Sequence, residues 1–286
     1  MATEFTRAGL TFDVTESGPP DGETVLLLHG FPQHRSSWDA LVPILNDAGY
    51  RTIAFDQRGY SPRARPKRRF DYRMPELVAD AKAAIDQLAG GRAHVVGHDW
   101  GSAVAWSIAA QEPASVASLT AVSVPHPFAF LRSMVTTRQG VRSWYMYLFQ
   151  LPWLPELLLR TQWKRSLVDY GRQTPALAER DRAAFTGPGA LTGPLNWYRA
   201  MLFVDPRRMA DKVSVPALLV WSDGDVFIDR RSVDRCAQYV TGPYRLEVLR
   251  GATHWIGDQA PEQLAQCLVP HLIEHTMTTT EPVRIA

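Results

Sequence analysis

Short apolar segments alternate with helical patterns through the first 125 residues of the chain. The apolar segments are rich in β-branched residues and nearly continuous in hydrophobicity, as strands buried on both faces of a sheet are. Strands are therefore predicted at residues 24–28, 51–55, 93–96 and 119–124. Helical spacing of apolar residues predicts helices over 74–88 and over 100–112, the second ending before Pro113. This alternation predicts an α/β fold with a mainly parallel sheet that helices cover on both faces.

The alternation stops after residue 127 and resumes near residue 212. The intervening segment has helical patterns at 144–159 and 196–203 and no clear strand pattern. Strands are predicted again at 216–221 and 244–249, followed by a helix over 261–274 with a kink at Pro270. The chain thus divides into a core (1–127 and 212–286) and an inserted helical cap, or lid, domain (128–211). Because ligand sites on open α/β sheets lie at the carboxyl ends of strands, we expect the cap to cover the site and exclude water.

The overall composition is that of a globular protein without a marked charge. Hydrophobic residues make up 45% of the chain, charged residues 21%, and the formal net charge is +2. Such a balance gives no argument for binding nucleic acid or membrane surfaces. A basic run at 63–73 has six cations in eleven residues. A solvated loop is the simpler interpretation of this run, and steering of anionic substrates is the alternative.

The cysteines and the apolar runs bear on location. The two cysteines, Cys236 and Cys267, have no CxxC spacing and fit a reducing compartment. The N-terminus lacks the apolar region of a signal peptide, and no run approaches the roughly 18 apolar residues of a membrane span. We therefore expect a cytoplasmic protein without a membrane span, either a monomer or a homodimer.

The segment VVGHDWGSAVAW (residues 95–106) predicts a reactive carboxylate at Asp99. Glycines two residues before and after Asp99 permit the sharp strand-to-helix turn that exposes a nucleophile. The alternative is that Asp99 caps the following helix. A carboxylate is already ionised at neutral pH and forms an ester when it attacks a saturated carbon. Asp99 therefore indicates displacement at an alkyl carbon, as in an epoxide or a haloalkane.

Four motifs, in order along the chain, resemble the α/β-hydrolase fold. They are HGFP (29–32), the turn at Asp99, WSDGDVF (221–227) and GATHW (251–255). Nucleophile, acid and histidine occur in that order in this fold. The resemblance covers nearly the whole chain and implies that His254 is a general base that activates water. It favours Asp225 as the acid that orients His254, although Asp223 is close by and one of the two could form a turn.

The same resemblance implies an oxyanion hole and a pocket. The hole consists of the backbone N–H groups of Phe31 and Trp100, which follow His-Gly and the nucleophile, respectively. His29, Pro32 and Trp255 are expected to line the substrate pocket, with His29 also holding the oxyanion loop by hydrogen bonds. The Phe31–Pro32 peptide bond is a candidate for the cis form. No metal ion and no cofactor are expected.

The leaving group separates epoxide from haloalkane chemistry. An epoxide oxygen needs a proton from a weak acid such as tyrosine, whereas a halide needs N–H donors. YMYLFQLP (145–152) resembles a lid motif of epoxide hydrolases and places one such tyrosine at Tyr145, with Tyr147 as the alternative. GPLNWYRAM (193–201) resembles their second lid motif and places the other at Tyr198. A single aromatic residue in a cap usually only packs, but two tyrosines in family-like motifs favour epoxide chemistry.

These residues predict a cofactor-independent epoxide hydrolase that acts on a small-molecule epoxide. A haloalkane or haloacid dehalogenase with the same Asp-His-Asp triad is the alternative. Against it, haloalkane dehalogenases generally carry Asn or Glu where this chain has Phe31. Fluoroacetate-type dehalogenases share HGFPQ but typically have Arg at the position of Trp100. A non-catalytic receptor for small molecules on the same fold is a third hypothesis.

Overall fold

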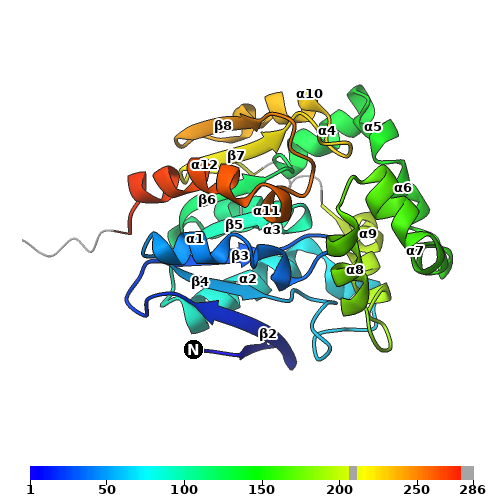
Figure 1. Cartoon of the computed structure of the whole chain (residues 1–286), viewed down its shortest axis with the longest axis horizontal. Coiled ribbons are helices and arrows are strands. Elements are labelled where there is room, and N and C mark those ends of the chain that lie inside the picture. The colour runs from blue at the N-terminus through cyan, green and yellow to red at the C-terminus, as the bar shows by residue number, and fades with distance from the viewer. Residues whose placement is uncertain (206–210, 278–286) are drawn as a thin grey trace, which may run out of the picture.

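The computed structural model describes residues 1–205 and 211–277, which fold around an eight-stranded sheet (Figure 1). The strand order is β1-β2-β4-β3-β5-β6-β7-β8. All pairs from β4 to β8 are parallel, whereas β1 and β2 join one edge in antiparallel pairs. The strands are β1 (Glu4–Arg7), β2 (Leu10–Ser17), β3 (Thr24–Leu28), β4 (Arg51–Phe55), β5 (Ala93–His98), β6 (Val116–Val122), β7 (Ala217–Ser222) and β8 (Tyr244–Leu249). The predicted mainly parallel α/β sheet is confirmed.

Helices cover both faces of the sheet, and β3 shows how its sequence serves both. Val25 and Leu27 pack into the apolar cluster of α1 and α12, while Leu26 and Leu28 pack into the cluster of α2 and α3. The core helices are α1 (Val42–Asp47), α2 (Met74–Leu88), α3 (Trp100–Gln111), α10 (Arg230–Asp234), α11 (Ile256–Gln259) and α12 (Pro261–Glu274), with shorter turns η1 (Arg35–Trp38), η2 (Arg69–Tyr72), η3 (Pro113–Ser115) and η7 (Cys236–Tyr239). The continuous apolar pattern of the central strands follows from this burial on two sides. α12 is one helix through Pro270.

The first two strands were not predicted from the sequence. Their residues alternate between buried and exposed, because an edge hairpin covers the core with one face only. Phe5 and Phe12 stack across the hairpin with ring centroids 4.7 Å apart. Ala8 and Gly9 both have positive φ, as a two-residue turn between antiparallel strands requires.

Between β6 and β7, the described residues form helices and no strand (Figure 1). The elements are α4 (Pro127–Thr136), α5 (Gln139–Arg142), α6 (Trp144–Leu148), α7 (Leu154–Lys164), η4 (Arg165–Tyr170), α8 (Pro175–Ala184), α9 (Thr192–Ala200) and η5 (Met201–Phe203). The helical pattern at 144–159 is two helices, because Trp153 adopts a φ of 52° between them. The domain boundaries at 128–211 stay a prediction, and residues 206–210 lie outside the described part of the chain.

Most cations of the basic run at 63–73 are at the surface, as a solvated loop would have them. Arg63, the first, pairs with Glu4 at an exposed site. No helix within residues 1–205 and 211–277 is both long and apolar enough to cross a bilayer.

A buried ion pair ties α2 to the loop after β4. The Arg58 guanidinium donates to both oxygens of Asp80 at 2.7 and 2.8 Å, and their side chains are 4% and 3% exposed. We expect Asp80→Asn to lower the free energy of unfolding by about 3 kcal/mol, because it removes the charge of the carboxylate that binds a buried cation at the two short distances and leaves that cation with the more distant Glu76, at 3.8 Å. Urea denaturation measures the change.

The matched control lies on the same helix. Asp86 pairs with Lys82 one turn away, and its side chain is 47% exposed. Asp86→Asn should therefore cost less than about 0.5 kcal/mol. Equal losses in the two variants would contradict the assignment to the buried pair.

Candidate active site

Asp99 occupies the sharp turn between β5 and α3. Its φ of 51° and ψ of −118° lie in a region that residues other than glycine rarely adopt. A Cβ at Gly97 would collide with the backbone of Gly101, and one at Gly101 would collide with the backbone of Leu28. The glycines thus let strand and helix approach closely, and Asp99 is presented at the carboxyl edge of the sheet.

His254 lies between two carboxylates. Its Nδ1 is 2.7 Å from Oδ2 of Asp225, and its Nε2 is 3.6 Å from Oδ2 of Asp99. Asp225 comes from the loop after β7, and His254 from the loop after β8. The structure therefore brings three residues far apart in the sequence into one row.

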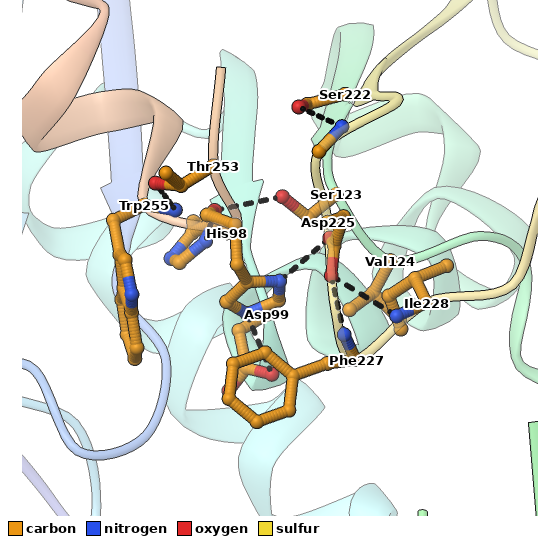
Figure 2. Close-up of polar contacts among 12 residues, drawn as sticks. His98, Asp99, Ser123, Val124, Ser222, Asp225, Phe227, Ile228, Thr253 and Trp255 are labelled. Carbon is orange, nitrogen blue, oxygen red and sulfur yellow. Dashed lines mark hydrogen bonds and ion pairs between the residues drawn. The ribbon is translucent and has the colours of Figure 1, made fainter. Parts of the chain in front are cut away.

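Backbone amides hold the Asp225 carboxylate in place. The N–H groups of Phe227 and Ile228 donate to its Oδ1 at 2.7 and 3.0 Å, as the dashed lines of Figure 2 show. Asp223 instead accepts a hydrogen bond from the Gly251 N–H at 2.7 Å. Of the two candidate acids, the structure places Asp225 against the histidine and uses Asp223 in a turn.

Two residues that the sequence did not single out for this role hold the backbone of His254. The His98 ring donates from Nε2 to the His254 carbonyl at 2.9 Å, and the Ser123 hydroxyl donates to the same oxygen at 3.0 Å. Burial and the neighbouring His254 lower the pKa of His98 to about 4, so His98 stays neutral. Its position directly before Asp99 is the signal that could have drawn attention to it.

The two carboxylates set the charge of His254. Burial alone would lower its pKa, but the charge and hydrogen bond of Asp225, together with Asp99, raise it to about 10. Burial alone would raise the pKa of Asp99, but hydrogen bonding and charge from His254 outweigh burial and lower it. At neutral pH the resting site therefore holds an imidazolium between two carboxylates.

One of the two proposed oxyanion donors contacts Asp99 directly. The Phe31 N–H donates to Oδ1 of Asp99 at 2.8 Å. Trp100 is the first residue of α3, where a backbone N–H has no partner within the helix. The Phe31–Pro32 bond is cis, which confirms that expectation.

His29 is not among the residues that line the cavity at Asp99, contrary to the expectation for it. Its side chain is buried, and Nε2 accepts from the Gln57 N–H at 3.1 Å while Nδ1 donates to the Gly30 carbonyl. The ring is turned into the core to hold the loop that carries Phe31. Pro32 and Trp255 do line the cavity.

Tyr145 and Tyr198 face the same cavity as Asp99. Their ring centroids are 6.2 Å apart. Burial and the nearby Asp99 charge raise the pKa of both hydroxyls well above the ordinary value, so both stay protonated at neutral pH. Tyr147, the alternative to Tyr145, is 63% exposed and points to the outside of the cap.

A buried arginine fixes the segment between the two tyrosines. Arg199 donates to the Phe149 carbonyl at 3.1 Å and to both oxygens of Glu156 at 2.8 and 2.9 Å. Gln150 donates to the Tyr198 carbonyl at 2.9 Å. These bonds join α9 to the turn after α6 and to the start of α7, and they fix the distance between Tyr198 and Tyr145.

Two cavities meet at Asp99. The larger has a volume of about 400 Å³ and the smaller about 210 Å³, and Asp99, Tyr145 and Tyr198 line both. Their other walls are mainly apolar, and the larger includes Phe227, whose ring centroid is 4.9 Å from that of His254. Phe227 lies within the WSDGDVF motif, yet its place in the wall was not predicted. No cluster of metal-ligating side chains occurs within the described residues.

Known proteins resemble this chain along most of its length. A family model described as alpha/beta hydrolase fold matches residues 23–261. Epoxide hydrolase 3 of Xenopus tropicalis is 35% identical over 93% of this chain and 76% of that protein. Epoxide hydrolase A of Mycobacterium tuberculosis is 32% identical over 92% of this chain and 94% of its own length. The AB hydrolase superfamily protein YfhM of Bacillus subtilis is 34% identical over 92% and 95%.

Solved structures agree with this match. Epoxide hydrolase A from Mycobacterium thermoresistibile superimposes with a TM-score of 0.81 at 27% identity, covering 96% of this chain and 98% of that one. An epoxide hydrolase of Bacillus megaterium in complex with an inhibitor gives a TM-score of 0.82 at 23% identity, covering 94% of this chain and 99% of that one, and supports the fold. Because the family model matches the chain from residue 23 to residue 261, the chain belongs to the α/β-hydrolase family.

Proposed function

We propose that this chain hydrolyses epoxides to vicinal diols through a covalent ester on Asp99. The observation that carries the proposal is a carboxylate at the strained turn that shares a cavity with two protonated tyrosines. A carboxylate supplies the nucleophile for a saturated carbon, and the hydroxyls supply donors for the epoxide oxygen. The relatives named as epoxide hydrolases support the same assignment.

In the first step, Oδ2 of Asp99 attacks a ring carbon of the epoxide. Oδ1 is held by the Phe31 N–H, which leaves Oδ2 as the oxygen free to form the new bond. The carbon–oxygen bond of the ring breaks, and the departing oxygen takes a proton from Tyr145 or Tyr198. The products of this step are a hydroxyalkyl ester and a tyrosinate.

The imidazolium of the resting site supplies the proton that converts the tyrosinate back to tyrosine. Ester formation removes the negative charge of Asp99, which is one of the groups that raise the pKa of His254. The imidazolium becomes more acidic as a result, and its proton returns the tyrosinate to tyrosine. His254 is then neutral and can act as a base.

In the second step, His254 takes a proton from water, and the hydroxide attacks the carbonyl carbon of the ester. The negative charge develops on Oδ1, where the Phe31 N–H already donates and where the Trp100 N–H is the expected second donor. Collapse of this intermediate expels the alkoxide of the diol, which takes a proton from His254, and the carboxylic acid left on Asp99 gives its proton back to the imidazole. Asp99 is again a carboxylate beside an imidazolium.

The positions of the two cavities bear on substrate shape. One cavity lies to each side of the group formed by Asp99, Tyr145 and Tyr198. An epoxide with substituents on both ring carbons can therefore extend in two directions.

In the alternative dehalogenase, the leaving halide would face the hydroxyl groups of Tyr145 and Tyr198, although a halide needs no proton in order to leave. A panel of chloroalkanes tests that alternative, with halide release but inert epoxides as its signature.

We expect His254→Gln to trap the ester, because glutamine cannot remove a proton from water at neutral pH. After addition of a small aliphatic or aryl epoxide, intact-protein mass spectrometry should find one adduct per chain. Peptide mapping should place that adduct on Asp99. The double variant Asp99→Ala/His254→Gln, which removes the nucleophile, should form none. Steady release of diol by His254→Gln at the wild-type rate would refute the two-step scheme.

The tyrosines can be tested with a neighbouring control. Tyr145→Phe and Tyr198→Phe should each slow ester formation about a hundredfold, because the epoxide oxygen loses a proton donor. Tyr147→Phe changes the same chemical group on the outside of the cap and should leave the rate unchanged. Single-turnover kinetics with excess enzyme measure the step. Equal rates in all three variants would remove the proton-donor role.

The protonation of His254 gives a third test. We expect ¹⁵N NMR of the imidazole to report an imidazolium in the free protein until the pH approaches about 10. Asp99→Asn should shift this titration to lower pH, because an amide removes a negative charge that favours the cation. Asp225→Asn should do the same, since it removes the charge at Nδ1. A titration near the ordinary pKa of histidine in wild type would contradict the charge balance above.

A further inference from the structure

Exposed apolar side chains gather on the helical segment between β6 and β7. Of the thirteen large hydrophobic residues that are exposed in the described part of the chain, ten lie within residues 128–205. Single exposed apolar residues are common on protein surfaces, but a concentration on one segment indicates an interaction site.

The densest part of this surface is formed by α6, the following turn and the start of α7. We call it the cap patch, and it comprises Trp144, Tyr147, Leu151, Trp153 and Leu157. Trp153 is 69% exposed and Leu157 is 50% exposed. None of Tyr147, Leu151, Trp153 and Leu157 lines the cavities at the nucleophile, so catalysis does not explain why they are apolar.

The larger cavity opens beside the cap patch. Its wall includes Trp144 from α6, Gln162 from α7, and Arg165 and Tyr170 from η4, and all four are exposed. In Figure 1, α6 and α7 lie at the margin of the molecule opposite the carboxyl-terminal helix α12. The cap patch and the mouth of the cavity therefore face solvent together.

The same segment carries a positive charge that the whole-chain balance conceals. Residues 132–172 contain seven arginines and lysines against two carboxylates, whereas the whole chain has a net charge of +2. Arg160, Lys164 and Arg165 are exposed, and none of them forms an ion pair with any residue in 1–205 or 211–277. Exposed cations thus follow the cap patch along the end of α7 and the start of η4.

We propose that the cap patch docks on an anionic phospholipid bilayer. Tryptophan and tyrosine rings favour the boundary between headgroups and acyl chains, and arginine and lysine reach anionic headgroups while their stems remain in apolar surroundings. Each such cation near an anionic bilayer adds a favourable electrostatic contribution. The chain lies on the bilayer surface and needs no spanning helix.

The charge favours a bilayer over a second copy of this chain. In a twofold dimer built on the cap patch, the same cations would face one another across the interface. Like charges brought together in this way oppose association. An anionic lipid surface instead supplies the complementary charge.

Docking would place the cavity mouth at the lipid boundary. An apolar epoxide dissolved in the bilayer could then enter past Trp144 and Tyr170 without crossing bulk water. This consequence rests on the proposed epoxide hydrolysis, whereas docking itself does not.

Co-sedimentation with vesicles tests docking without any substrate. Wild-type protein should bind vesicles of phosphatidylcholine and phosphatidylglycerol, and bind phosphatidylcholine vesicles much more weakly. Trp153→Ser/Leu157→Ser should weaken binding about tenfold or more, because it removes two exposed apolar side chains from the contact. Arg160→Gln/Lys164→Gln should weaken binding to the anionic vesicles by roughly fivefold for each cation, and high salt should do the same.

The control is an exposed apolar residue far from the cap. Ile273 on α12 is 60% exposed, and Ile273→Ser should bind vesicles as wild type does. Far-ultraviolet circular dichroism and thermal unfolding should be alike in all variants, and any turnover of a small water-soluble epoxide should be unchanged in Trp153→Ser/Leu157→Ser. These readouts separate loss of docking from loss of folding or of the proposed activity.

Three results would overturn the proposal. One is wild-type protein that stays in the supernatant with anionic vesicles at low salt. The second is binding that Trp153→Ser/Leu157→Ser does not weaken. The third is a wild-type dimer, seen by analytical ultracentrifugation without lipid, that this double variant converts to a monomer, since the cap patch would then be the contact between copies.

Discussion

The position of one imidazolium between two carboxylates governs the rest of the site. His254 keeps its proton because Asp225 and Asp99 both stabilise the cation, and Asp99 stays ionised because the cation lies beside it. Each group therefore depends on the other for its charge. The scaffold contributes by fixing three loops that follow different strands, with His98 and Ser123 holding the histidine backbone. A displacement of one of these loops would therefore shift the pKa of Asp99 and of His254 together.

The parts of this arrangement that depend on local sequence were predictable. Glycines around Asp99 specify the sharp turn, and the central strands reveal themselves because burial on both faces leaves a continuous apolar run. Choices between neighbours were harder. Asp223 and Asp225 lie on the same loop, and only the three-dimensional path of β7 and β8 decides which carboxylate meets the imidazole. Tyr147 and Tyr145 both lie on α6, and they differ in which side of the helix they occupy, with Tyr147 exposed on the outside of the cap.

Other features depend on contacts between distant segments, which no short motif contains. The edge hairpin β1–β2 has an alternating pattern that is too short to stand out, and it is fixed by pairing with β4. His29 lies next to the oxyanion loop in the sequence, yet its ring faces the core because Gln57 binds it there. The cationic cap surface is hidden in the sequence for a simpler reason. Averaging over the whole chain cancels its charge against carboxylates elsewhere.

The clamp formed by Arg199 makes the two tyrosines behave as one rigid part. It joins α9 to the turn after α6 through the Phe149 carbonyl and to the start of α7 through the Glu156 carboxylate, so it closes a loop of chain that includes the rest of α7, η4 and α8. η4 and the part of α7 after Glu156 form much of the outer wall of the larger cavity, and they form no hydrogen bond with the Arg199 guanidinium, so they can change in sequence without altering the spacing of the hydroxyl groups. The shape of the cavity and the spacing of the proposed proton donors can therefore vary independently. Changes in the outer wall of the cap need not move Tyr145 and Tyr198.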